Sequence, residues 1–193
     1  MNTLKEILYN NNWSGTNCSL TTDKASTHNY VEGFYENSFS SYRDKKVKVL
    51  EIGIASGTSL LLWDEYFVNN TGVYGIDINS SDITNEVEKR ERINTIIGNA
   101  YDQKLTETLP IFDIIIDDGP HTLESMVSFI ELYLPKLNSN GIMVIEDIQS
   151  LDWMSELIEV FNESKKDTDE CEVVDLRESI GRYDDLMFII RRK

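Results

Sequence analysis

Two pairs of adjacent acidic residues follow apolar runs in this sequence, and their side chains are suited to holding a metal ion. Asp117-Asp118 comes after an isoleucine run, and Glu146-Asp147 comes after Ile142-Met143-Val144-Ile145. Both runs predict buried strands, whose carboxyl ends would meet at one edge of a parallel sheet. Asp118, Glu146 and Asp147 would then offer three hard oxygen ligands and no thiolate, a set that favours Mg²⁺.

His121 follows Asp118 by three residues and is the candidate general base. It would stand at the start of the next helix, and its unperturbed pKa of about 6.5 suits proton transfer near neutral pH. Taken alone, a strand-end aspartate more often caps a helix or forms a turn, and a lone histidine after Gly-Pro can be a solvated residue. Acids from two neighbouring strands together with this histidine favour a catalytic site, with His121 and Asp118 as its catalytic residues.

A turn that contains glycines, Gly53-Ile54-Ala55-Ser56-Gly57, connects an apolar run with a helix-like segment. Asp77 ends the next apolar run, about 20 positions further on, where an acidic residue is placed to bind ribose hydroxyls. The spacing differs from Gly-x-Gly-x-x-Gly, which argues against a dinucleotide and against a nicotinamide-dependent oxidoreductase. Glu51 makes the predicted site acidic, which suits a cationic nucleoside. Together these features predict a binding site for S-adenosylmethionine.

The other candidate cofactor residues follow from the rule that ligands bind beyond the carboxyl ends of the strands in open α/β sheets. The cofactor residues expected at the ends of the first four strands are Glu51, Gly53, Ser56, Gly57, Thr58, Asp77, Ile78, Asn99, Ala100 and Asp117. Because side chains alternate along a strand, one carboxylate of Asp117-Asp118 can face the cofactor while the other faces the open cleft.

The composition is that of a single globular domain. The chain has 193 residues, 40% of them hydrophobic and 27% charged, and its formal net charge is −16. A nucleic-acid partner needs a basic face, so this charge argues against one, and it also disfavours an anionic membrane surface. We find no apolar run long enough to span a bilayer, and the two cysteines, Cys18 and Cys171, lie far apart. We therefore expect a cytoplasmic protein with reduced thiols.

Apolar runs and helix-period segments alternate through most of the chain. Strands are expected near 47–53, 72–77, 93–98, 112–118, 140–146, 171–176 and 185–191. Helices are expected near 57–69, 121–134 and 150–163, with weaker ones near 81–90 and 102–108, and a short amphipathic one from Val31 to Phe39. The pattern predicts an α/β, Rossmann-like fold with a seven-stranded, mostly parallel sheet and helices on both faces. The last two strands lack a convincing helix between them and should form an antiparallel pair at one edge, with an antiparallel C-terminal edge strand.

With these residues identified, the chain resembles the class I S-adenosylmethionine-dependent methyltransferases. More narrowly, it resembles the metal-dependent sugar O-methyltransferases of the mycinamicin and demethylmacrocin type. Three segments carry the resemblance: Thr22-Asp23-Lys24 with His28-Asn29-Tyr30, then Glu51 to Gly57, then Asp117-Asp118-Gly119-Pro120-His121 with Glu146-Asp147. Two positions depart from the family pattern. Pro120 stands where these enzymes usually have serine, and Asn99 where an aspartate commonly contacts the adenine side.

The resemblance implies roles for several residues. It places Mg²⁺ on Asp118, Glu146 and Asp147, with His121 as the base. It also brings the Thr-Asp-Lys and His-x-Tyr segment close to the active site, so we expect Lys24 and Tyr30 among the cofactor-binding residues. Residues 1–46 would then be an N-terminal helical and loop segment that packs on the core and lines the active site. Residues 47–193 would form the S-adenosylmethionine-binding domain.

The expected reaction is methyl transfer from the sulfonium to a hydroxyl of a sugar or sugar nucleotide. Two alternatives stay open at this point: an O-methyltransferase of a catechol-like small molecule, and a non-catalytic partner subunit that binds S-adenosylmethionine. The sequence leaves the acceptor, the position methylated and the oligomeric state open, a homo-oligomer included.

Overall fold

A seven-stranded sheet forms the centre of the protein. The computed structural model describes residues 2–15, 20–81 and 83–193. The strands are β1 (Lys48–Ile52), β2 (Gly72–Asp77), β3 (Ile93–Ile97), β4 (Phe112–Asp117), β5 (Leu137–Ile145), β6 (Glu170–Asp175) and β7 (Leu186–Arg191). They lie in the order β3-β2-β1-β4-β5-β7-β6.

The strands β1 to β5 pair in parallel, whereas β7 pairs antiparallel with both β5 and β6. The predicted Rossmann-like α/β fold is confirmed. The C-terminal strand is antiparallel as expected, but it lies between β5 and β6, so the edge strand is β6. Chain order reverses beside β1, because β2 lies on one side of it and β4 on the other. This is the position at which open α/β sheets bind ligands.

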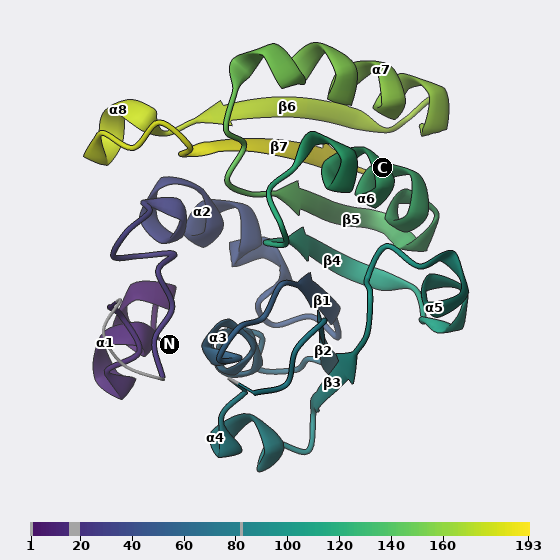
Figure 1. The fold of residues 1–193 in the computed structure, drawn as a ribbon. Helices are drawn as coiled ribbons and strands as arrows, with labels where there is room; N and C mark the ends of the chain where they lie inside the picture. Colours follow the sequence, from purple (N-terminus) through teal and green to yellow (C-terminus); the bar gives the residue numbers. More distant parts are fainter. Residues whose placement is uncertain (1, 16–19, 82) are drawn as a thin grey trace.

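Helices cover both faces of the sheet (Figure 1). The helical elements are α1 (Leu4–Asn11), η1 (Val31–Tyr35, a π-helical turn), α2 (Glu36–Phe39), η2 (Ser40–Tyr42), α3 (Thr58–Tyr66), α4 (Asn85–Glu88), α5 (Gln103–Thr108), α6 (Leu123–Tyr133), η3 (Leu134–Lys136), η4 (Leu151–Trp153), α7 (Met154–Ser164) and α8 (Arg177–Ile180). The predicted helix near 81–90 is reduced to α4, and α8 fills four positions between the last two strands. Cys18 lies outside the described residues.

The core has two halves, one on each face of the sheet. Successive strand residues alternate between them, as the two-residue period of a strand requires. In β5, for example, Ile142 and Val144 join the half that packs on α1, η1, α2 and α3, and Met143 and Ile145 join the half beneath α6 and α7. Strands buried on both faces explain why β1, β4 and β5 are almost continuously apolar.

The N-terminal segment lies beside the carboxyl ends of the strands. In Figure 1 the arrowheads of β4, β5 and β6 point towards the side where α8 and the segment around α2 are drawn. Hydrogen bonds join these distant parts: Asn29 Nδ2 donates to Ser179 Oγ at 2.6 Å, and Lys24 and Tyr30 contact residues that follow β4 and β5. The division of the chain at residue 46 stays a prediction.

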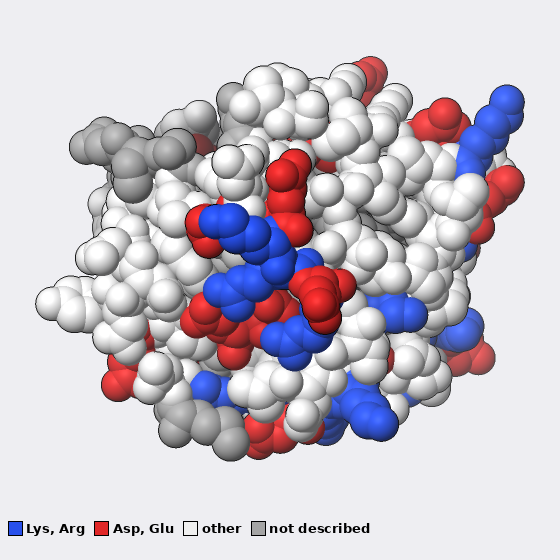
Figure 2. Space-filling view, turned by 90° about the horizontal axis from the view of Figure 1, so that it is seen from below, with Lys and Arg blue, Asp and Glu red and all other residues white. Residues whose placement is uncertain are grey.

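Basic side chains on the surface are paired with acids where they gather. Figure 2 shows blue and red side chains side by side at the centre of the face on the α4 side of the molecule. Ion pairs in this region join Arg90 to Glu65 at 2.8 Å and Arg92 to the buried Asp64 at 2.8 Å. Among the helices of the described residues, none has the length and apolarity to cross a membrane.

Candidate active site

Two adjoining cavities run along the carboxyl ends of β1 to β4. The larger has a volume of about 560 Å³ and the smaller about 380 Å³, within the usual range for small-molecule sites. Four residues line both: Asp23, Gly53, Ala55 and Asp118. We call the pair the trough. Its larger cavity is lined by the predicted cofactor residues Gly53, Asp77, Ile78, Asn99 and Ala100, and its smaller one by Gly53, Ser56 and Thr58.

Gly53 brings the loops after β1 and β4 into backbone contact. Its φ is +78°, and a Cβ added to it would lie 1.9 Å from the carbonyl oxygen of Asp118. Only glycine fits there, both for its left-handed backbone and for the space it leaves. The close approach therefore fixes Asp118 beside the glycine turn. Gly57 lies just before α3 as its N-cap and is not among the residues that line the trough.

Asp77 holds the glycine turn against the end of β2. Its Oδ2 accepts hydrogen bonds from the amides of Ile54 and Ala55 at 3.0 and 3.1 Å, and its Oδ1 accepts one from Asn79 at 2.9 Å. A carboxylate offers about four acceptor positions, so three are already used within the protein. Asp77 lines the larger cavity, but it also builds the turn, a role that its spacing in the sequence did not indicate.

Tyr101 is a cavity residue that we did not predict. It follows β3 and lines the larger cavity, and its hydroxyl donates to Asp117 Oδ1 at 2.8 Å. Burial raises the pKa of Asp117 to about 7, although hydrogen bonds from Tyr101 and the Gly119 amide act in the opposite direction. Asp117 is only 3% exposed and does not line the cavity itself. Its contact with the cavity is indirect, through the hydrogen bond from Tyr101. Ile78, in contrast, is 79% exposed at the cavity.

Besides Gly57 and Asp117, three predicted cofactor residues do not line the trough. Glu51, Lys24 and Tyr30 are at most 1% exposed, and none of them lines either cavity. Glu51 points into the core, where its Oε2 accepts a hydrogen bond from Trp63 Nε1 at 2.8 Å. All three are buried where the N-terminal segment packs on the strand ends, and their contact with the cofactor stays a prediction.

Lys24 is surrounded by carboxylates. Its Nζ lies 2.7 Å from Asp118 Oδ2 and 3.2 Å from Glu51 Oε1, and it also donates to Glu146 Oε2. Burial opposes the charge on the ammonium, but the three acids outweigh it and raise the pKa of Lys24 well above its usual value. For the acids burial dominates, which raises the pKa of Asp118 and brings that of Glu146 to about 8. Tyr35 completes this group by donating to Glu146 Oε1 at 2.7 Å.

Asp147 belongs to a second group. Tyr30 donates its hydroxyl to Asp147 Oδ1, and His28 Nδ1 lies 3.4 Å from the same oxygen. His28 is itself bonded to Asp185 Oδ1 at 2.5 Å, and its ring stacks on Tyr30 with a centroid distance of 4.8 Å. These contacts join the N-terminal segment, the end of β5 and the start of β7.

His121 lies between the two groups. Its Nε2 is 3.6 Å from Asp147 Oδ2 and 3.9 Å from Asp118 Oδ1, and the residue also lines the larger cavity. Burial lowers the pKa of His121, although the charge of Asp147 acts in the opposite direction, so the imidazole is neutral at pH 7. Both His121 and Asp147 have a φ of +54°, a conformation that residues other than glycine adopt rarely and that is often found at functional sites.

The predicted metal set is only partly assembled. Among the described residues, three sets of ligand atoms lie within 4.8 Å of one another: Asp118, His121 and Asp147; Glu51, Asp118 and Glu146; and His28, Asp184 and Asp185. Asp118 and Asp147 thus meet, but Glu146 falls in a separate set. That Asp118, Glu146 and Asp147 hold one metal ion together stays a prediction; here Lys24 donates to Glu146, and the adjacent residues Glu146 and Asp147 diverge at the strand end.

Several members of these groups were outside our predicted site. Asp185 and Tyr35 gave no signal, since they lie in a predicted strand and a predicted helix, and Asp184 lies in the connecting stretch between the last two predicted strands. Asp23 and His28 stood in the segment that carries the family resemblance, but that resemblance alone assigned them no role. Asp23 lines both cavities, and His28 is 4% exposed beneath the site.

Comparison with known proteins identifies the family of the chain. A methyltransferase domain family matches residues 50–148, just over half of the chain. Among characterised relatives, 8-demethyl-8-alpha-L-rhamnosyl tetracenomycin-C 2'-O-methyltransferase of Streptomyces olivaceus is 34% identical over 144 residues. Demethylmacrocin O-methyltransferase of Streptomyces fradiae is 32% identical over 145 residues. The matches cover 68% and 69% of this chain but only 36% and 35% of the relatives, so the chain spans about a third of their length.

A similar solved structure is the MycE methyltransferase from the mycinamycin biosynthetic pathway, in complex with Mg and SAH. It superposes with a TM-score of 0.73 at 22% sequence identity and covers 100% of this chain and 55% of its own. This likeness shows the fold. The domain match establishes the family. The chain therefore belongs to the methyltransferase-domain family, in its class I, S-adenosylmethionine-dependent type.

Proposed function

We propose that this domain transfers a methyl group from S-adenosylmethionine to a hydroxyl of a sugar carried by a small molecule, with the help of a divalent metal ion such as Mg²⁺. One observation carries the proposal: His121 lies at the trough, beside two carboxylates whose free oxygens face it. A neutral base next to a cofactor site and a pair of hard oxygen ligands is the arrangement that metal-assisted O-methylation requires.

The trough suits S-adenosylmethionine, which supplies the methyl group on its sulfonium. Asn99, Ala100 and the exposed Ile78, which follow β2 and β3, line the larger cavity. Ser56 and Thr58 hydroxyls line the smaller cavity at the start of α3, where backbone amides without side-chain caps favour a carboxylate. These residues would orient the cofactor along the strand ends, with its adenosine in the larger cavity.

The acids fit a divalent ion on one side of Asp118 and not on the other. Glu51 and Glu146 already share the Lys24 ammonium, which would repel a second cation a few ångströms away. Asp118 Oδ1 and Asp147 Oδ2 instead face His121 and are hard oxygen donors. Mg²⁺ held by these two acids would lower the pKa of a hydroxyl bound to it.

His121 would accept the hydroxyl proton. The imidazole is neutral at pH 7 because burial lowers its pKa, so it can act as a base without first losing a proton. The structure of the loop supports this role, since His121 faces the cavity through a backbone conformation with φ +54°. Orientation of hydroxyl and methyl donor would supply the remaining acceleration.

The relatives favour a sugar acceptor. The two from Streptomyces are named for methylation of a rhamnosyl tetracenomycin and of demethylmacrocin. This chain spans only about a third of their length, so the sugar acceptor is for this chain part of the proposal.

A methylation assay tests the function. The protein is incubated with S-adenosylmethionine and a panel of rhamnosylated polyketides, sugar nucleotides and catechols, with Mg²⁺ or with EDTA. We expect S-adenosylhomocysteine to form only with the sugar acceptors and to fall to background with EDTA. Turnover of catechols alone would contradict the sugar assignment. Cofactor binding by calorimetry without turnover on any acceptor would indicate a non-catalytic subunit.

A further inference from the structure

We propose that Lys24, His28 and Tyr30 are positioning residues that preset the Asp118 and Asp147 carboxylates for a divalent cation. The inference rests on the proposed function and deepens it, because it names what holds the metal-binding acids in place. It also replaces the predicted cofactor contacts of Lys24 and Tyr30.

The Asp118 carboxylate is held through one of its oxygens. Lys24 Nζ lies 2.7 Å from Oδ2, whereas the other oxygen, Oδ1, is the one nearest His121, at 3.9 Å from Nε2. Lys24 is 1% exposed and is anchored by Glu51 and Glu146 as well, so its ammonium cannot follow a moving partner. It therefore fixes which oxygen of Asp118 faces the catalytic histidine.

The Asp147 carboxylate is held in the same way by different groups. Its Oδ1 accepts the Tyr30 hydroxyl hydrogen bond and lies 3.4 Å from His28 Nδ1, and its Oδ2 lies 3.6 Å from His121 Nε2. The Asp147 amide also donates to the Tyr30 hydroxyl at 3.3 Å. One phenol thus fixes both the backbone and the side chain of Asp147, whose φ of +54° is an uncommon conformation.

The holding groups are themselves rigid. Asp185 bonds His28 at 2.5 Å, and the His28 ring stacks on Tyr30 with an angle of 18° between the planes. Both rings are buried, at 4% and 1% exposure. Neither residue lines the trough.

The two carboxylates therefore present one free oxygen each to the same place, beside His121. A cation that binds there finds ligands whose rotamers are already fixed, so little side-chain entropy is lost on binding. Lys24 lies 94 positions from Asp118 and Tyr30 lies 117 positions from Asp147, so a distant segment of the chain supports the site.

The test compares metal and cofactor affinity in matched tyrosine variants. Calorimetry measures Mn²⁺ binding and, separately, S-adenosylhomocysteine binding to wild type, Tyr30→Phe and Tyr66→Phe. Tyr66 is a buried tyrosine whose hydroxyl also bonds a carboxylate, Glu36, at 3.4 Å, but it lies outside the site. We expect Tyr30→Phe to weaken Mn²⁺ binding about 10- to 100-fold, as loss of an outer partner of a metal ligand does, and to leave S-adenosylhomocysteine affinity unchanged. Tyr66→Phe should change neither.

A second pair of variants checks His28. His28→Ala should weaken Mn²⁺ binding, and His28→Asn, whose amide keeps a donor near the position of Nδ1, should restore part of it. Unchanged Mn²⁺ affinity in Tyr30→Phe would overturn the inference, as would loss of S-adenosylhomocysteine affinity with Mn²⁺ affinity retained, which is the result of a cofactor contact. Wild type that binds no Mn²⁺ would also overturn it. Wild type that binds both ligands but transfers no methyl group contradicts only the proposed function.

Discussion

The trough at the carboxyl ends of β1 to β4 and the carboxylate cluster of Glu51, Asp118, Glu146 and Asp147 share Asp118 and lie along one edge of the sheet, but different interactions build them. In the trough, Asp77 accepts hydrogen bonds from backbone amides of its own and the neighbouring loop. In the cluster, Lys24 reaches Glu146 from 122 positions away, and His28 reaches Asp185 from 157 positions away.

The difference shows how each region obtains its polarity. The trough is built from turns and backbone groups, so its polar contacts join residues that are close in sequence. The cavity itself is open to solvent. The cluster buries like charges, which is costly unless they are paired and hydrogen-bonded. It therefore depends on side chains from the far parts of the chain. Four substitutions would break or sharpen this contrast.

The largest effect is expected at the histidine that faces both regions. His121→Ala should lower kcat about 10²- to 10⁴-fold, the usual contribution of a general base, and leave S-adenosylhomocysteine affinity unchanged because the trough is intact. Initial rates at saturating cofactor and acceptor measure it, with calorimetry for the ligand. Activity close to wild type would show that His121 is not the base.

The next effect concerns the charge balance of the cluster. Lys24→Met removes the cation shared by three buried acids, and we expect a loss of about 3–5 kcal/mol in the free energy of unfolding, as for a buried pair that loses one partner. Lys89→Met is the control, since the Lys89–Glu86 pair is exposed and should contribute about 0–1 kcal/mol. Urea denaturation measures both. Equal losses would mean that Lys24 is not the electrostatic support of the cluster.

A smaller effect tests the backbone contact that joins the two regions. Gly53→Ala should cost roughly 2–4 kcal/mol, because the left-handed backbone and the 1.9 Å approach to Asp118 both oppose a side chain. Gly181 has a similar φ of +82° with nothing within 4 Å of the added Cβ, so Gly181→Ala should cost only about 1 kcal/mol. If the two variants lose the same stability in urea, the close approach is not what requires glycine.

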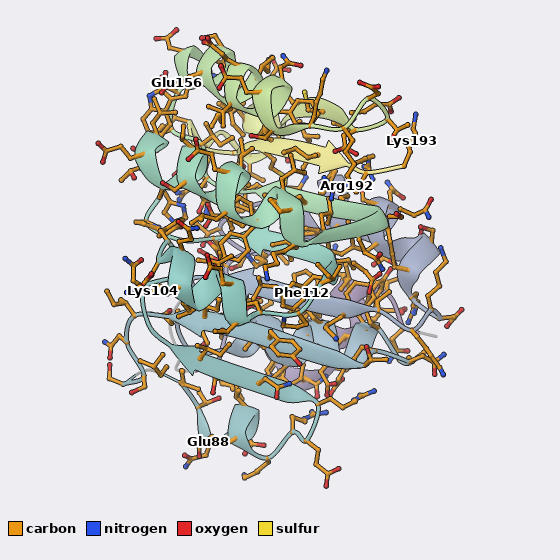
Figure 3. The ribbon with its side chains drawn as sticks, turned by 90° about the vertical axis from the view of Figure 1, so that its right-hand side faces the viewer. Glu88, Lys104, Phe112, Glu156, Arg192 and Lys193 are labelled. Carbon is orange, nitrogen blue, oxygen red and sulfur yellow. The ribbon has the colours of Figure 1, made fainter. Side chains whose placement is uncertain are left out.

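The smallest effect is expected at an ion pair outside the site, in which one acid pairs with one base. Asp169 accepts from Arg192 at 3.0 Å beside Lys193, at the end of β7 (Figure 3). Burial opposes ionisation of Asp169, but hydrogen bonds from Arg192 and the Lys166 amide outweigh it and hold its pKa below the usual value.

Because the pKa of Asp169 is lower in the folded protein, the unfolded chain binds the proton at a higher pH than the folded protein does as the pH falls. The stabilisation from Asp169 is then present above pH of about 4 and is lost as the pH falls through the lower folded value. Asp169→Asn should remove this part of the acid dependence. Urea midpoints between pH 3 and 6 would measure it on the order of 1 kcal/mol. A variant that follows the wild-type curve would contradict it.

The local patterns predicted most of the fold. The apolar runs located all seven strands, and β2 has the predicted bounds, 72–77. The start of β5 was missed because Asn138, Ser139 and Asn140 are exposed residues within the strand. The insertion of β7 between β5 and β6 was also missed, since the order of strands in space depends on packing between distant segments rather than on periodicity.

For the site too, the sequence predicted what depends on neighbouring residues and missed what depends on distant ones. The spacing of Gly53 and Asp77 predicted two residues of the trough, because strand, turn and helix follow one another there. The ion pair between Glu51 and Lys24 was not predicted, because nothing near either residue in the sequence indicates that they will neutralise each other, and their contact with the cofactor stays a prediction. The metal and catalytic roles stay predictions that the variants above test.

The position of β7 has a consequence for synthesis on the ribosome. At ~5–20 residues per second, the emergence of His28 and of Asp185 is separated by an interval on the order of ten seconds. At the end of that interval β5 and β6 have been made while β7, the strand that joins them, has not, so both carry unpaired edges. Entry of β7 pairs it with both strands and brings Asp185 to His28, so the support that we propose for the metal-binding acids is completed only after β7 has been made.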